Sequence, residues 1–155
     1  MSIDQHFVEY LSANGYHPRS SLHSDFLSER IIADLVEHCP KLKERAKLGE
    51  VVGKLRHHQQ VNHNDWVIDI AIGSCAGSPI PPENGRMRVA PPALIQIAIE
   101  LKSIITEHGK ARRNRLRDFE AFHSYAHQYD PRTIAAAFLV VNSAKHFWVF
   151  TESSG

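Results

Sequence analysis

Apolar residues recur along the first half of the chain at the spacing of amphipathic helices. Between residues 25 and 40, and again from 41 to about 59, they fall at three- and four-residue steps, so one side of each segment is apolar. We therefore expect two helices, separated at Pro40. The stretch before Asp25 is expected to carry one short helix and a loop.

The second half of the chain is patterned as strands around one long helix. Four segments are rich in β-branched, aromatic or other apolar residues, and we expect them to be strands: 66–72, 95–102, 134–141 and 146–151. A helix is expected over 109–129, where Asp130-Pro131 ends it. Five of the eight prolines fall within 77–92, which indicates a long loop of a kind that is uncommon unless it is functional.

This order of helices and strands predicts an α/β fold. We expect a sandwich with a central mixed sheet of about four or five strands, helices on both faces and an N-terminal helical subregion. Because the chain of 155 residues is close to the size of one domain, we expect a single domain over 1–155. Its helical N-terminal part would be 1–40 and its catalytic core 41–151.

The composition excludes several classes of protein. With 43% apolar residues, the chain is too hydrophobic to stay disordered. Its longest purely apolar run, 134–141, is well short of the roughly 20 residues that span a bilayer, so no membrane partner is expected. The N-terminus has no signal-peptide pattern, and two cysteines make no disulfide framework. We therefore expect a cytoplasmic protein.

The polar residues of the predicted strands carry the candidate chemistry. Alternate residues of a strand face opposite sides of a sheet, so Glu100 and Lys102 share one face of segment 95–102, and Asp69 stands among small residues on segment 66–72. Burying an unpaired charge costs several kcal/mol. If the strands are neighbours, these three groups converge. They then either compensate one another's charge or bind a metal ion. Mg²⁺ suits such a site, because it takes one or two protein carboxylates.

The same alternation predicts which apolar residues of these strands lie together. Two sets are each expected to share one face: Trp66, Ile68, Ile70 and Ile72 on the first strand, and Ile95, Ile97, Ile99 and Leu101 on the second.

Asp69, followed 31 positions later by Glu100-Leu101-Lys102, resembles the D…ExK signature of the PD-(D/E)XK, or restriction endonuclease-like, nuclease superfamily. The resemblance covers about 66–142, where a helix packs over the sheet and one more strand follows, and it makes segment 41–59 the first core helix. The residue before Asp69 is Ile68, where the signature has proline. The implied fold is a restriction endonuclease-like three-layer sandwich.

The resemblance implies a Mg²⁺-dependent DNA endonuclease, most similar to type II restriction endonucleases. Asp69, Glu100 and Lys102 would be the catalytic residues. The two carboxylates would bind the metal together with the backbone carbonyl of Leu101, and the Lys102 ammonium would assist the attacking water. Mn²⁺ is expected to substitute for Mg²⁺.

Many relatives in that superfamily add a metal-binding glutamate from the first core helix. Glu37, Glu44 and Glu50 are the candidates in this sequence. We choose Glu50 because it is nearest to the first predicted strand. A solvated helix charge is the alternative for each of them.

A basic cluster opens the helix that follows Lys102. Its members fall within eight positions of a chain whose net charge is only +1: Lys110, Arg112, Arg113, Arg115 and Arg117. Lysine and arginine neutralise phosphates, so we predict that the cluster binds the backbone of double-stranded DNA, with a solvated basic face as the alternative. The helix is also expected to bury one stripe: Leu116, Phe119, Phe122, Ala126 and Tyr129. Arg115 lies beside the stripe and is expected to bind a phosphate near the site or a structural acid.

Two other functions fit the same residues. A repair or recombination nuclease of the junction-resolvase kind would use the same core, and a non-catalytic nucleic-acid-binding module would keep Asp69 and Lys102 as a buried ion pair. Cutters of palindromic sites tend to be two-fold dimers, so a homodimer is a corollary. The 77–92 loop and the N-terminal helices have no other role in this scheme, and we expect them to read bases or bind a second subunit. The eleven histidines are expected to be polar surface residues, although His123 and His127 have a spacing that suits zinc.

Overall fold

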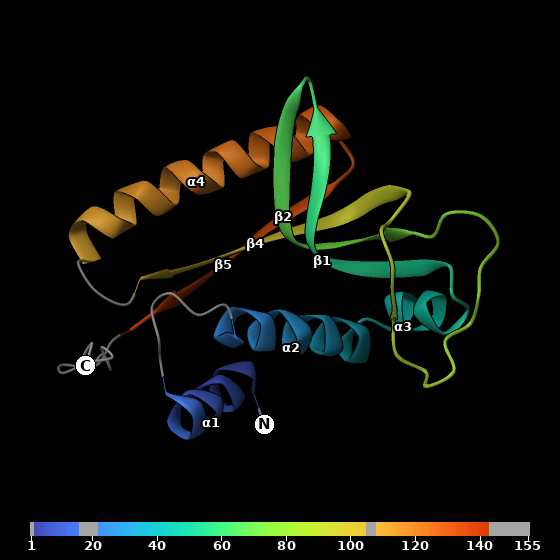
Figure 1. Ribbon diagram of the computed structural model, residues 1–155, viewed down its shortest axis with the longest axis horizontal. Helices are drawn as coiled ribbons and strands as arrows, with labels where there is room; N and C mark the ends of the chain where they lie inside the picture. Colours follow the sequence, from blue (N-terminus) through green and yellow to red (C-terminus); the bar gives the residue numbers. More distant parts are fainter. Residues whose placement is uncertain (1, 16–21, 105–107, 143–155) are drawn as a thin grey trace, which may run out of the picture.

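The computed structural model describes residues 2–15, 22–104 and 108–142, and of residues 108–111 it describes only the backbone (Figure 1). The helices and strands of this part of the chain are α1 (Ile3–Asn14), α2 (Leu22–His38), α3 (Pro40–Lys47), β1 (Val51–Val61), β2 (Asn64–Ser74), β3 (Arg88–Val89), β4 (Leu94–Ile104), α4 (His108–Tyr129) and β5 (Ile134–Val141).

The strands form one mixed sheet in the order β3-β1-β2-β4-β5. The pairs β1–β2 and β2–β4 are antiparallel, whereas β1–β3 and β4–β5 are parallel. Parallel neighbours need a crossover connection, and α4 supplies the one between β4 and β5. The α/β prediction with a mixed sheet is therefore confirmed.

Helices cover both faces of the sheet (Figure 1). On one face, α1, α2 and α3 contribute Phe7, Leu27, Ile31 and Leu42 to a core that also contains Val51, Ile70, Ile72 and Ile99. On the other face, α4 contributes Phe122 and Ala126 to a core that also contains Val61, Trp66, Ile68, Ala71, Ile95 and Ala98. The hydrophobic core therefore has two parts, one on each side of the sheet.

The prediction of one helix over 41–59 is wrong beyond Lys47. Helix α3 ends there and β1 begins at Val51. Gly49 causes the break: it has φ 73°, and any side chain at this position would collide with the backbone carbonyl of Ile80. The apolar residues that follow pair with β2 as a buried strand, and a short apolar run cannot be assigned to helix or strand by periodicity alone.

The other predicted elements agree with the structure within a few residues. Segments 66–72, 95–102 and 134–141 lie within β2, β4 and β5, 109–129 lies in α4, and 77–92 is a loop interrupted only by the two-residue strand β3. The predicted strand over 146–151 lies outside the described residues.

Both central strands change face along their length, contrary to the expected alternation. On β2, Trp66 and Ile68 belong to the core beneath α4, whereas Ile70 and Ile72 belong to the core on the opposite face. Residues two apart on a regular strand share a face, so the backbone reorients between Ile68 and Ile70. Asp69 lies at this point.

On β4 the change of face is a β-bulge. The β2–β4 register shifts between Ile72 and Gly73, and Ile95 packs beneath α4 although Ile97 and Ile99 pack on the other side. A Cβ at Gly73 would collide with the carbonyl of Leu94, so the two backbones approach closely where glycine permits it.

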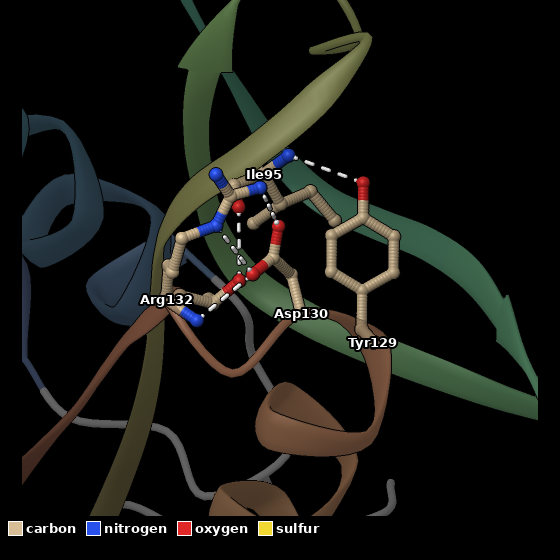
Figure 2. A network of polar contacts seen from close by, with 5 residues as sticks. Ile95, Tyr129, Asp130 and Arg132 are labelled. Atoms are coloured by element: carbon tan, nitrogen blue, oxygen red, sulfur yellow. Dashed lines mark hydrogen bonds and ion pairs between the residues drawn. The ribbon is translucent and has the colours of Figure 1, made fainter.

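The connection between α4 and β5 satisfies the backbone groups of the bulge (Figure 2). The Ile95 N–H donates to the Tyr129 hydroxyl at 3.2 Å, and the Thr133 hydroxyl donates to the Ile95 carbonyl at 3.0 Å. Asp130 accepts from the backbone N–H and the guanidinium of Arg132 in the same turn. The bulge of β4 is thereby fixed to the start of β5.

Candidate functional site

The structure brings Asp69, Glu100 and Lys102 together on the two central strands, and Asp118 of α4 lies near Glu100. Ile70 pairs with Ile99, so Asp69 and Glu100 occupy the next positions of neighbouring strands. The Asp69 Oδ2 atom accepts a hydrogen bond of 2.7 Å from the backbone N–H of Leu101. The first acid and the Glu-x-Lys segment are therefore in direct contact.

Glu100 and Lys102 form an ion pair along β4. Their side chains are only 11% and 25% exposed, so both charges are largely removed from water. Burial raises the pKa of the Glu100 carboxyl, the hydrogen bond from Lys102 opposes this change, and the negative charges of Asp69 and Asp118 reinforce it. The negative charge in the site is thus only partly compensated by Lys102.

Asp118 is a site residue that the sequence analysis missed. It lies on α4, close enough to Glu100 to affect its pKa, and its Oδ2 atom accepts from Arg115 Nη1 at 2.6 Å. The expectation that Arg115 binds a structural acid is therefore met by Asp118. The signal was available, because Asp118 lies four positions before the buried Phe122 and thus on the same side of the helix.

Three of the remaining basic residues of α4 lie at the surface. Arg112, Arg113 and Arg117 are exposed, whereas the side chain of Lys110 lies outside the described part of the chain. Leu116 is 53% exposed and does not belong to the buried stripe, contrary to the prediction. It lies six positions before Phe122, which corresponds to about 120° around a helix.

The structure does not bring Glu50 to Asp69. Because α3 ends at Lys47, Glu50 lies at the start of β1, where its carbonyl accepts from the N–H of Cys75. Asp69 is six positions from Cys75 along β2, or about 20 Å at the rise of a strand. The Glu50 carboxylate instead pairs with Arg45 at 3.4 Å.

Asp69 and Glu100 have the donor chemistry that a magnesium ion requires. Mg²⁺ takes hard oxygen ligands, and one or two protein carboxylates suffice because the ion keeps several waters. Burial is the main cause of the raised pKa of Glu100, and the neighbouring Asp69 charge adds to it, so a cation beside the two carboxylates would favour their charged forms. Among the described residues, no group of three or more histidine, cysteine, aspartate or glutamate side chains is arranged to hold a metal ion. A two-carboxylate site for Mg²⁺ is compatible with these donors.

Comparison with models of protein families, with curated proteins and with solved structures found no match to this chain. In the part of the chain that the structure describes, no helix combines the length and the apolar character needed to cross a membrane.

Proposed function

We propose that the chain is a Mg²⁺-dependent DNA endonuclease with a restriction endonuclease-like, PD-(D/E)XK, three-layer sandwich. The observation that carries the proposal is the contact between Asp69 on β2 and the Glu100-Leu101-Lys102 segment on β4. The order of the elements supports it, because α4 packs over the sheet after Lys102 and β5 follows, as the resemblance implies. A double-stranded DNA substrate accords with the cytoplasmic location expected from the sequence.

The carboxylates of Asp69 and Glu100 and the carbonyl of Leu101 would hold the ion, with Mn²⁺ as a substitute. When bound, the ion lowers the pKa of a coordinated water and neutralises charge on the scissile phosphate. The ion pair with Lys102 opposes the raising effect of burial on the pKa of Glu100, and the Lys102 ammonium would orient the attacking water. Attack on phosphorus breaks the bond to the 3′ oxygen and leaves a 3′-hydroxyl and a 5′-phosphate.

The basic cluster on α4 would hold the DNA backbone. Arg112, Arg113 and Arg117 are exposed and follow the site along the chain, so in this proposal they would neutralise phosphates next to the scissile one. Lys110 belongs to the cluster by sequence. Arg115 differs because it is engaged with Asp118, so we assign it to the support of the site. A homodimer remains a prediction from the symmetry of palindromic sites.

Cleavage of unmethylated plasmid DNA by the purified protein tests the proposal. Discrete fragments are expected with Mg²⁺ and none without it. Asp69→Asn and Glu100→Gln should abolish cleavage, and both should weaken Mg²⁺ binding measured by calorimetry without DNA. Glu44→Gln removes an exposed carboxylate from α3 and should change neither result. Cleavage of branched DNA irrespective of sequence would instead assign the same residues to a repair or recombination nuclease.

One observation favours a second function, a nucleic-acid-binding module without catalysis. Lys102 already forms an ion pair with Glu100, and this pair can be purely structural. The pair differs from the one expected from the sequence, since Asp69 contacts the Leu101 N–H. A module of this kind would bind DNA equally well with and without Mg²⁺, and Lys102→Met would alter only its stability.

A further inference from the structure

The tip of the β1–β2 hairpin has an unusual composition. Of its nine residues, 57–65, seven are histidine, asparagine or glutamine, and none is lysine or arginine. Most of these side chains are exposed: His58, Gln60, Asn62, His63, Asn64 and Asp65. An exposed hairpin that served only solubility would be expected to carry lysine and glutamate. This tip instead carries amides and imidazoles, which combine donors and acceptors; the Asn64 amide also donates to the Asn62 carbonyl at 3.3 Å, and its oxygen remains exposed as an acceptor.

The single acid of the tip is hydrogen-bonded within the hairpin. The two oxygens of Asp65 contact His58 Nδ1 at 2.8 Å and Gln60 Nε2 at 3.3 Å. The tip is therefore a polar surface with little net charge, unlike the arginine-bearing first half of α4. A phosphate backbone is bound by cations, so the chemistry of the tip suits a different part of DNA.

The hairpin is held in place against α4. The Asn62 amide donates to Gln128 at 3.1 Å. Trp66, which is 2% exposed, packs with ring centroids 5.4 Å from Phe122 and 6.2 Å from Tyr129. Figure 1 shows the hairpin standing up from the sheet beside the C-terminal part of α4. The tip thus keeps a fixed orientation relative to the helix that carries the arginines.

The turn of the hairpin is strained at the residue that it displays. Asn62 and His63 have φ values of 48° and 67°, as both central residues of a type I′ turn require. Asparagine tolerates this region, but glycine is the favoured residue at the second position. A histidine at this position therefore lowers the stability of the turn. Backbone strain that the surrounding structure maintains is typical of functional positions.

We infer that the hairpin tip reads base edges in the major groove of double-stranded DNA, with His63 and Asn64 as specificity-determining residues. This inference rests on the proposed nuclease function. The major groove admits a two-stranded β-ribbon, and amide side chains pair with adenine there through two hydrogen bonds. Phosphate contacts from α4 set the position, and contacts from the hairpin carry the sequence information.

The position of the tip relative to the site fits this role. Asn64 lies five positions from Asp69 along β2, or about 17 Å at the rise of a strand, which corresponds to about five base pairs. The 77–92 loop, which the sequence suggested as a base reader, follows the opposite end of β2. The hairpin tip lies instead at the other end of β2, against the C-terminal part of α4.

Selection from a randomised duplex tests the inference. The full chain is bound to the duplex pool with Ca²⁺ in place of Mg²⁺, and the bound DNA is sequenced. The wild-type protein is expected to enrich one motif. His63→Gly removes the imidazole and relieves the turn, and Asn64→Ala removes the amide. Each variant should lose about tenfold or more of the discrimination at one position of the motif, while affinity for unselected duplex stays within about twofold.

Two controls separate recognition from folding. His63→Gly should melt at the same temperature as the wild type or higher, because glycine fits a positive φ. His38→Ala removes an exposed imidazole from the last turn of α2, on the other face of the sheet, and should enrich the unchanged motif.

The outcomes distinguish this inference from the proposed function. If both hairpin variants enrich the wild-type motif undiminished, the hairpin does not read bases. A wild-type protein that binds and cuts duplex DNA but enriches no motif overturns the reader and leaves the nuclease intact. A wild-type protein that binds no duplex overturns both.

Discussion

The backbone N–H of Leu101 donates a hydrogen bond of 2.7 Å to the Asp69 carboxylate across the two central strands. Asp69 occupies the position where β2 changes face, and the β2–β4 pairing ends beside it at Ile70 and Ile99. The carboxylate therefore holds β4 in register as well as supplying a negative charge. Its structural and chemical contributions can be separated by substitution.

Asp69→Asn keeps an oxygen acceptor for the Leu101 N–H but removes the charge. We expect its free energy of unfolding in urea to stay within about 1 kcal/mol of wild type, because the hydrogen bond survives. Cleavage should nevertheless be abolished. Asp69→Ala leaves the N–H without its partner, which costs about 1–3 kcal/mol. A fully folded Asp69→Asn protein that still cuts DNA at the wild-type rate would contradict the metal-binding role.

The Glu100–Lys102 ion pair predicts a coupled effect on stability. Lys102→Met leaves Glu100 buried without its counter-charge and should lower the free energy of unfolding by about 2 kcal/mol, less than for a fully buried pair because part of Lys102 meets water. Glu100→Gln added to Lys102→Met should restore part of that loss. A double-mutant cycle measured by urea denaturation gives the coupling energy, and additive losses would show that the pair contributes nothing.

The same variants separate catalysis from structure. If the Lys102 ammonium assists the attacking water, Lys102→Met should reduce the cleavage rate by about 10²–10⁴-fold at temperatures where the protein stays folded. An equal rate in folded wild-type and Lys102→Met protein would remove the lysine from the mechanism.

The Tyr129 hydroxyl predicts a measurable contribution from the β4 bulge. It accepts from the Ile95 N–H at 3.2 Å, next to Gln96, the residue that the shifted β2–β4 register leaves without a partner. Tyr129→Phe should therefore lower the free energy of unfolding by about 1 kcal/mol. Tyr10→Phe is the matched control, since Tyr10 stacks on Phe26 and phenylalanine preserves the stacking. Equal effects of the two substitutions would show that the bulge does not depend on the hydroxyl.

The contact between Asp130 and Arg132 predicts that the stability of the fold depends on pH under acid conditions. The guanidinium and backbone N–H of Arg132 hold the pKa of the Asp130 carboxyl at about 2. Because the pKa is lower than the ordinary value of 3.8, the pair stabilises the fold above that value. This stabilisation is lost as the pH falls towards 2. Titration of the carboxyl carbon by NMR should show the low pKa, and Arg132→Ala should raise it towards 3.8. An unchanged titration in the variant would contradict the assignment to Arg132.

The sequence predicted most of the elements and the grouping of Asp69, Glu100 and Lys102, because strand-forming residues and the need of buried charges for partners are visible in single segments. The sequence misassigned 51–59, because a buried strand and one side of a helix can both appear as apolar runs. The helix ends because Gly49 has a positive φ and lies against the backbone of Ile80, a contact that the local sequence does not show. The shared faces of Trp66 with Ile70 and of Ile95 with Ile97 were also predicted wrongly. Both reversals depend on contacts between strands, which no single segment encodes.

The exposed arginines of α4 predict how affinity for DNA responds to salt. Each phosphate neutralised by a basic side chain contributes about −0.9 to the slope of log K against log salt concentration. Arg113→Ala and Arg117→Ala should each make the slope shallower by about 1, and each should weaken binding to all sequences alike. Lys41→Ala, at an exposed cation in the first turn of α3 on the opposite face, should leave the slope unchanged. Fluorescence anisotropy with a labelled duplex at several salt concentrations measures it, and equal slopes for the arginine variants and the wild type would place the DNA backbone elsewhere on the protein.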